Sequence, residues 1–270
     1  MNFKKIELIF FIAFILLDIF LFASYSQKDD VVESTVSTTT KHSSNSILKS
    51  IKSDQISVGE LSTKKTNGYY IAAFNKDAWR SDAGKLHDVL WTFNSHRLTA
   101  TFENRIKLKN SEKPQQTLDE VVKDSTKVIN GDKYVYDKYL STRKTVVYVQ
   151  QVKNKPIYSP TGQIRFNLKK NYVLGYTQKY IPEIQSLKGK RPVISQERAL
   201  IWLYQYNKLV NNSTVKWIRL SYTRLLNANN STIYIPTWVL AVESNSSGSV
   251  QYRRINAFTG AYMEENVSLR

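Results

Sequence analysis

The stretch IELIFFIAFILLDIFLFASY, residues 6–25, determines how the rest of the chain is organised. A helix that rises about 1.5 Å per residue needs about 20 mostly apolar residues to cross the ~30 Å hydrocarbon core of a bilayer. Lys4 and Lys5 stand directly before this stretch, and positive charge at the start of a membrane helix keeps the N-terminus in the cytoplasm. We therefore predict a cytoplasmic tail at residues 1–5, a transmembrane helix at 6–26 and an extracellular remainder.

A cleaved signal peptide is the alternative interpretation, because it also has a basic start and an apolar run. Its apolar region is usually about 7 to 15 residues long and ends in small residues at the cleavage site. Here the run is longer and ends in Ser24-Tyr25-Ser26, a weak cleavage match. The chain has no cysteine, which excludes a lipoprotein anchor and any disulfide. The sequence favours a retained single-pass anchor in the cell membrane.

Asp18 lies deep in the predicted anchor, where a carboxylate costs up to about 2.5 to 3.5 kcal/mol and usually faces protein. Phe11, Phe14 and Phe22 are seven and four residues before it and four after it, so they share its helix face. This face is a candidate contact with another transmembrane helix. The alternative is that Asp18 is protonated or reaches the outer interface and contacts no partner.

The charge of the chain lies outside the predicted anchor. The formal net charge is +17, and Lys4 and Lys5 cancel Glu7 and Asp18 within the first 26 residues. A basic surface beside a membrane is attracted to anionic lipid or to anionic wall polymers such as teichoic acids. Nucleic acid is not an expected partner, because the basic residues form no tight run and the predicted topology places them outside the cell.

After the anchor, composition predicts a Ser- and Thr-rich tether at residues 27–52, followed by two extracellular units at 53–182 and 183–270. Each unit is predicted to contain a helix followed by antiparallel strands, so the fold class is α+β. In the first unit, Thr117 and Glu120 form a capping-box pattern that predicts a helix over 117–129. In that unit the predicted strands are 68–74, 97–108, 134–139, 145–152, 163–168 and 172–181.

Residues 75–95 are expected to form a loop or short helical segment whose Trp79 and Trp91 plug a small core. In the second unit, Ser195 is predicted to cap a helix that ends near Leu209. The strands predicted to follow it are 215–226, 233–242 and 250–258.

The sequence predicts no enzyme, no cofactor and no metal site. The three histidines, at 42, 87 and 96, form no HExxH motif and no spaced set with carboxylates. Ser-x-x-Lys occurs four times, at Ser46, Ser62, Ser141 and Ser213, but none is followed by a Ser-Asp-Asn or Lys-Thr-Gly element. The chain also lacks Gly-x-Ser-x-Gly and a phosphate loop.

Three segments resemble the YycI (WalI) family of regulatory proteins: MNFKKIELIFFIAFILLDIFLF at the start, YVQQVKNKPIYSPTGQIRFNLKKNYVLGYTQKY in the middle, and IPTWVLAVES with YRRINAFTGAYME at the end. The helix-plus-sheet unit that ends in NAFTG is also similar to the PepSY type. The resemblance implies a YycH/PepSY-like extracellular fold. It also implies an accessory regulator of cell-wall signalling in Gram-positive bacteria, which acts with a YycH-type protein on the sensor histidine kinase WalK of the WalK–WalR (YycG–YycF) two-component system through its transmembrane helix. Family members usually carry an amide where this chain has Asp18.

An exposed aromatic patch in the last sheet is a candidate surface for the YycH-type partner, and its predicted members are Tyr234, Trp238, Tyr252 and Phe258. Alternation along the strand also fits a core role, because Trp238 shares a face with Leu240 and Val242. A different function stays open as well. In this alternative the anchor is passive, and the outer sheets bind anionic wall polymer or a protease target.

Overall fold

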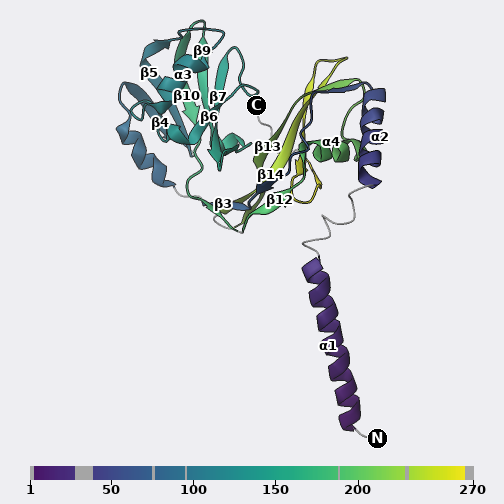
Figure 1. Cartoon of the computed structure of the whole chain (residues 1–270). Helices are drawn as coiled ribbons and strands as arrows, with labels where there is room; N and C mark the ends of the chain where they lie inside the picture. The colour runs from purple at the N-terminus through teal and green to yellow at the C-terminus, as the bar shows by residue number, and fades with distance from the viewer. Residues whose placement is uncertain are drawn as a thin grey trace. The chain divides into compact units, whose positions relative to one another are not determined.

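The computed structural model describes residues 3–27, 39–74, 77–94, 96–187, 189–228 and 231–264. The chain divides into two compact units, Met1–Ser53 and Asp54–Arg270. The first unit contains helices α1 (Phe3–Gln27) and α2 (Thr39–Ser53), and the second contains every described strand (Figure 1).

The two helices of the first unit can be compared with the predicted anchor and tether. α1 is a continuous helix of 25 residues that includes the whole apolar stretch. α2 differs from prediction, because a tether was expected at residues 27–52 where the structure has 15 helical residues. Serine and threonine are only about 0.5 kcal/mol per residue worse than alanine in a helix, so their abundance does not prevent one. Residues 28–38 of the predicted tether lie outside the described residues.

The first sheet of the second unit is antiparallel and has the order β4-β5-β10-β9-β7-β6, with β8 paired to β7. Its strands confirm most of the strands predicted between residues 97 and 181 and add two, β4 and β8. They are β4 (Val89–Asn94), β5 (Arg97–Lys107), β6 (Tyr134–Asp137), β7 (Thr145–Val152), β8 (Lys155–Pro156), β9 (Gln163–Lys169) and β10 (Tyr172–Gln178).

Helix α3 (Gln115–Lys123) covers one face of the first sheet. Leu118, Val121 and Val122 of α3 pack with the inward side chains of the strands, among them Leu98 and Phe166. The predicted capping box is wrong. The N-cap residue is Pro114, without a side-chain cap, and the Thr117 hydroxyl instead accepts a hydrogen bond from the Lys109 backbone N–H at 2.9 Å. The helix ends at Lys123, six residues before the predicted end.

Short 3-10 helices fill the links around this core: η1 (Asp77–Lys85), η2 (Gly131–Lys133) and η3 (Pro160–Gly162). Trp79 in η1 is buried, with its ring edge-on to Phe93 at 4.7 Å, which confirms its predicted role as a core plug. Trp91 is not such a plug, because it remains 39% exposed on β4.

The second sheet has the order β1-β13-β14-β15-β16, and β3 pairs with both β14 and β11. β1 runs parallel to β13, whereas the other pairs are antiparallel. A small separate sheet joins β2 to β12. The strands are β1 (Ile56–Val58), β2 (Thr66–Gly68), β3 (Ile71–Phe74), β11 (Ile184–Ser186), β12 (Arg191–Val193), β13 (Ser213–Ala228), β14 (Ser231–Ser244), β15 (Val250–Asn256) and β16 (Tyr262–Met263).

The structure distributes the strands differently from the predicted tandem units. β1 and β3 precede the first sheet in the chain, yet they pair with strands of the second sheet. The predicted strand 68–74 is divided between β2 and β3. Ile71, Ala72 and Ala73 are all buried, so β3 is an interior part of the second sheet.

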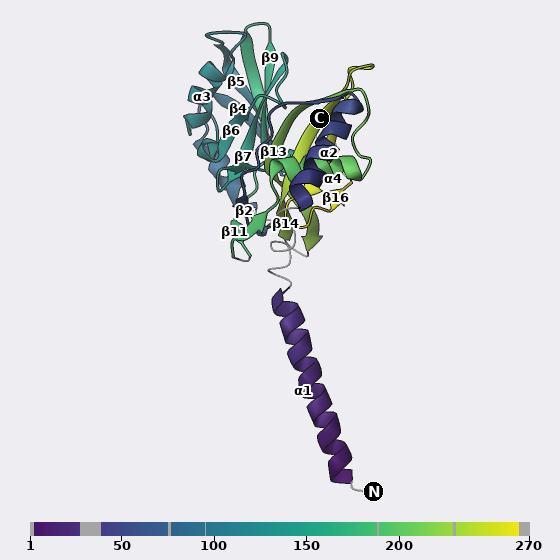
Figure 2. The same ribbon diagram turned by 45° about the vertical axis from the view of Figure 1, so that its right-hand side comes forward.

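Helix α4 (Gln196–Gln205) begins as predicted, since the Ser195 hydroxyl accepts a hydrogen bond from the Arg198 backbone N–H at 3.2 Å. It ends four residues earlier than predicted. Within the second unit, α3 and α4 lie on the outer faces of two sheets that are side by side (Figures 1 and 2). Val147 and Val149 of β7 pack with Val239 of β14 between the sheets.

Candidate partner-binding surfaces

The predicted helix-contact residues lie together on α1. At 3.6 residues per turn, Phe11, Phe14 and Phe22 fall within about 40° of Asp18 around the helix axis. Their rings are 63%, 64% and 73% exposed, and Asp18 is exposed too. The side chains of α1 are described at residues 7, 8 and 10–23, and every one of them is exposed. α1 therefore presents Asp18 within a large apolar surface.

Within the described residues, no helix is both long enough and apolar enough to cross a membrane.

Two of the four aromatic residues predicted for an extracellular interface are core residues. Tyr234 is 3% exposed and Trp238 is 8% exposed. The Trp238 indole N–H donates to the Ile194 carbonyl at 2.8 Å, and the Tyr234 hydroxyl lies 3.3 Å from the Thr161 hydroxyl. Because these polar groups already have internal partners, including Tyr234 and Trp238 in an exposed patch was wrong.

The other two predicted aromatic residues, Tyr252 and Phe258, are half-buried and lie in separate contacts. Phe258 stacks on Tyr70, with ring centroids 4.8 Å apart and planes 28° apart. Tyr252 lies on β15 within 5.9 Å of the Trp217 ring and 6.1 Å of the Tyr158 ring. The structure therefore does not bring the four predicted residues together as one surface.

Tyr252 belongs to an aromatic and charged cluster between the two sheets, which we call the seam. Its central ion pair joins the Arg219 guanidinium of β13 to the Asp137 carboxylate of β6 at 2.5 Å. Arg219 also lies over the rings of Tyr139 and Trp217, at 5.6 and 5.3 Å from their centroids. The seam was not predictable from the sequence, because its members are distant along the chain and carry no motif.

Asp137 is fully buried and uses both carboxylate oxygens. One accepts backbone N–H groups of Tyr139 at 2.9 Å and Leu140 at 3.1 Å, while the other accepts from Arg219. A buried carboxylate needs such partners, because taking an unpaired charge out of water costs several kcal/mol. These contacts are explained by a structural role, in which Asp137 helps to hold the two sheets together, and they require no catalytic role.

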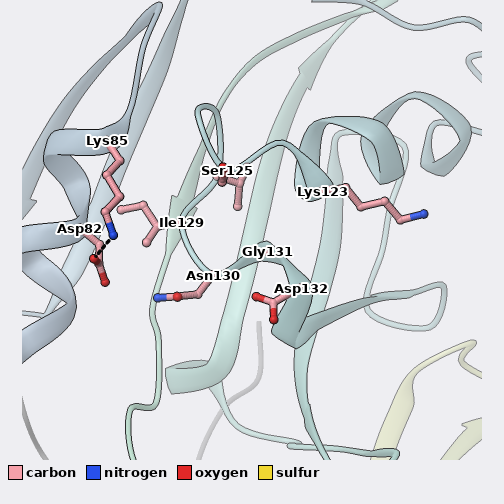
Figure 3. A pocket seen from close by; sticks show the side chains of 9 residues that line it. Asp82, Lys85, Lys123, Ser125, Ile129, Asn130, Gly131 and Asp132 are labelled. Atoms are coloured by element: carbon pink, nitrogen blue, oxygen red, sulfur yellow. Dashed lines mark hydrogen bonds and ion pairs between the residues drawn. The ribbon is translucent and has the colours of Figure 1, made fainter.

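A shallow hollow of about 260 Å³ lies beside α3 and η2 (Figure 3). Asp82 and Lys85 form an ion pair of 2.7 Å on one side, Asn130 and Asp132 lie on the other, and Lys123 extends away from them. The opposed charges largely neutralise each other, and the lining has no nucleophile beside a base. Across the described ranges, no group of three or more histidine, aspartate or glutamate side chains is placed to hold a metal ion.

Two exposed apolar side chains on β4 were missed in the sequence. β4 is an edge strand of the first sheet, and its Leu90 and Trp91 are 65% and 39% exposed. The signal was the run VLWTFN, which is rich in β-formers but shows no clean alternation.

The amino-acid sequence matches a known protein family. The sequence model described as YycI protein matches residues 34–258. The chain belongs to the YycI family. The YycI family implies a regulatory protein of the WalK two-component system, membrane-linked and associated with a sensor kinase.

Two solved structures are distantly similar to the chain. An uncharacterized protein from Eubacterium rectale ATCC 33656 is 11% identical to this YycI protein, with a TM-score of 0.48, and the match covers 79% of this chain and 92% of that one. The YpeB C-terminal domain of Bacillus megaterium is 14% identical, with a TM-score of 0.39, and covers 83% and 96%. No curated protein matches the chain.

Proposed function

We propose that this YycI protein is a non-enzymatic accessory regulator that is anchored in the cell membrane by α1 and acts on a WalK-type kinase together with a YycH-type protein. The observation that carries the proposal is the exposed face of α1 with Phe11, Phe14, Asp18 and Phe22. Large exposed apolar surfaces mark contact with membranes or other proteins. The N-terminus would be cytoplasmic, and the second unit would be extracellular.

The Asp18 carboxylate alone cannot supply the coupling free energy that control of a kinase needs. A partner biases a two-state kinase only by its difference in affinity for the two states, and a coupling of about 1 to 3 kcal/mol shifts the ratio about 5- to 150-fold. A polar contact between helices in lipid contributes only about 0.6 to 2 kcal/mol. Packing by the phenylalanines must therefore supply part of the coupling.

The test compares two faces of the same helix. We expect Phe14→Ala with Asp18→Leu to reduce both control of the kinase and its co-purification with the intact protein in detergent. The control is Leu16→Ala with Phe20→Ala, because these exposed side chains lie on the opposite side of α1. Equal effects of the two pairs would contradict a specific face.

Replacing residues 6–22 by an unrelated apolar helix separates attachment from signalling. Under the proposal the second unit still folds and reaches the surface, but kinase control is lost. If signalling persists after this replacement, or if a mature form beginning near Gln27 works without α1, the anchor is passive.

The extracellular contact with a YycH-type protein is the less defined part of the proposal. Tyr252 and Phe258 remain candidates, because both are only half-buried. Crosslinking from each position to the co-expressed partner tests them separately, with buried Trp238 as the position at which no crosslink is expected.

A further inference from the structure

The first sheet has one face that α3 does not cover and that the second sheet covers only at β7. On β5, Leu98, Ala100 and Phe102 point toward α3 and are buried, whereas the residues between them point away and are exposed. The second sheet packs against the outward side chains of β7, such as Val147 and Val149. The outward side chains of β5 remain exposed, as do those of Asn167, Lys169 and Tyr172 on β9 and β10, and we call this surface the open face.

The open face is basic at both ends. Arg97 begins β5 and Lys107 ends it, with Arg105 on the same face two residues earlier, so the cations at the two ends are separated by roughly 33 Å at about 3.3 Å per residue. Tyr172 pairs directly with Lys107 on one side and Lys169 on the other. Paired residues share a sheet face about 5 Å apart, so these three side chains form one row. Glu103 is the one acidic residue of β5.

Lysines on the α3 side of the first sheet are arranged differently. Lys85, Lys127 and Lys133 each lie within 3.1 Å of an aspartate carboxylate, and Lys109 lies 2.5 Å from Glu120. On the open face, by contrast, Arg97, Arg105, Lys107 and Lys169 make no ion pair within the described part of the chain. The pKa of Lys179 is lowered by its burial and by the nearby Arg97, so like charges are also crowded at this end.

Hydroxyl and amide groups occupy the centre of the open face. Thr99 of β5 pairs with Thr177 of β10, and Thr101 lies in the neighbouring row, two residues along β5. Asn167 on β9 is exposed beside them. The surface therefore offers hydrogen-bond donors between the cations at its two ends.

We propose that the open face binds a linear polyol-phosphate polymer. Such a chain carries repeated negative charges that match the separated cations, and its hydroxyl groups match the threonine and asparagine side chains. Arg97, Arg105, Lys107 and Lys169 outnumber Glu103 on this face, and such an excess of positive charge attracts a negatively charged partner. Single-stranded nucleic acid fits less well. Proteins that bind it stack its bases on several aromatic rings, whereas the outward positions of β5, β9 and β10 include one such ring, that of Tyr172.

The test uses the full chain in neutral detergent and a lipid-free glycerol-phosphate polymer as the probe. We expect Arg105→Gln, Lys107→Gln and Lys169→Gln together to weaken binding about tenfold or more, and to reduce the slope of log affinity against log salt by about 2 to 3. The matched control is Lys123→Gln, Lys127→Gln and Lys133→Gln, which removes the same charge from the α3 side. The control is expected to change affinity less than twofold.

Several results would overturn the proposal. Equal losses in the two triple variants would mean general attraction by net charge. Tighter binding to phosphatidylglycerol vesicles or to single-stranded DNA than to the polymer would assign the face to a different ligand, and absence of polymer binding would remove the ligand altogether. The measurement does not involve the kinase, so its outcome is independent of the proposal for α1.

Discussion

Gly248 and Gly260 have nearly the same left-handed backbone conformation, with φ of +68° and +70°, but different surroundings. A Cβ atom at 260 would lie 1.4 Å from the Trp202 ring of α4, whereas at 248 it would meet nothing within 4 Å. The backbone needs glycine at both positions, but only at 260 does the packing of α4 also require it. Conformation and packing can therefore be separated by experiment.

We expect Gly248→Ala to lower the free energy of unfolding by about 1 to 2 kcal/mol, which is the cost of a left-handed backbone for a residue with a Cβ atom. Gly260→Ala should cost more, because Trp202 must also move. Urea unfolding of the two variants measures the difference in their free energies of unfolding, which the midpoints report directly when the m-values are equal. Similar midpoints would show that α4 repacks without penalty.

The ion pair of the seam gives a second residue-scale prediction. Arg219→Met leaves the buried Asp137 carboxylate without its cation, which should destabilise the protein by about 3 to 5 kcal/mol. Adding Asp137→Leu should recover part of this loss, although the Tyr139 and Leu140 backbone N–H groups then lack their acceptor. A double-mutant cycle in urea measures the coupling, and strictly additive losses would contradict a direct interaction.

Buried tyrosines predict loss of stability at high pH. Burial raises the pKa of Tyr134, Tyr148 and Tyr176 above the ordinary value of 10.0, and for Tyr148 the hydrogen bond to Asp119 raises it further. In the unfolded chain these phenols ionise near pH 10, so the folded state binds more protons above that pH. Stability contributed by the neutral phenols is therefore complete below pH 10 and is lost as pH rises beyond it.

Chemical unfolding at increasing pH checks this expectation, with phenolate absorbance as the second signal. Tyr148→Phe should make the decline less steep, since one raised pKa is removed. A denaturant midpoint of the wild-type protein that stays constant above pH 10 would contradict the predicted loss of stability.

Individual helices and strands were predicted correctly where the sequence signal is local. The alternation of Leu98, Ala100 and Phe102 with polar residues predicted β5, and Ser195 predicted the start of α4. Prediction failed at α3, because Thr117 lies inside the helix that follows Pro114. It also failed at β4, where apolar residues point to both faces of an edge strand.

The cap of α4 can be tested directly. Ser195→Ala removes the acceptor for the Arg198 N–H and should cost about 1 kcal/mol, whereas Ser195→Asp should retain most of the stability because aspartate also caps helices. Thermal unfolding of the two variants is the measurement. Equal losses for alanine and aspartate would mean that the hydroxyl acts by packing and not by capping.

At the scale of the whole molecule, pairing between distant strands could not be predicted. Alternation shows which side of a strand is buried, but it does not identify the neighbouring strand. β1 and β3 therefore looked like parts of the first predicted unit, although they pair with β13 and β14. The seam depends on the same long-range arrangement, and this is why only Tyr252 of its members was a predicted residue.

Fragments test this arrangement. A fragment of residues 183–270 lacks β1 and β3. Its β14 therefore has no β3 beside it and loses the buried side chains of Ile71 and Ala73, so we expect this fragment to remain largely unfolded. A fragment of residues 54–270 retains both sheets and should unfold in one cooperative transition. Circular dichroism during urea unfolding distinguishes the two, and a cooperative transition in the shorter fragment would restore the tandem description.

The short parallel contact of β1 also has a mechanical consequence. Because the covalent chain enters the second unit at residue 54, tension applied through the N-terminal helices reaches β1 before any other strand. β1 pairs with β13 over three residues only, while β13 and β14 are joined along most of a long hairpin. A pulling force would thus detach β1 first, which makes this strand the weakest connection between the N-terminal helices and a sheet that stays folded.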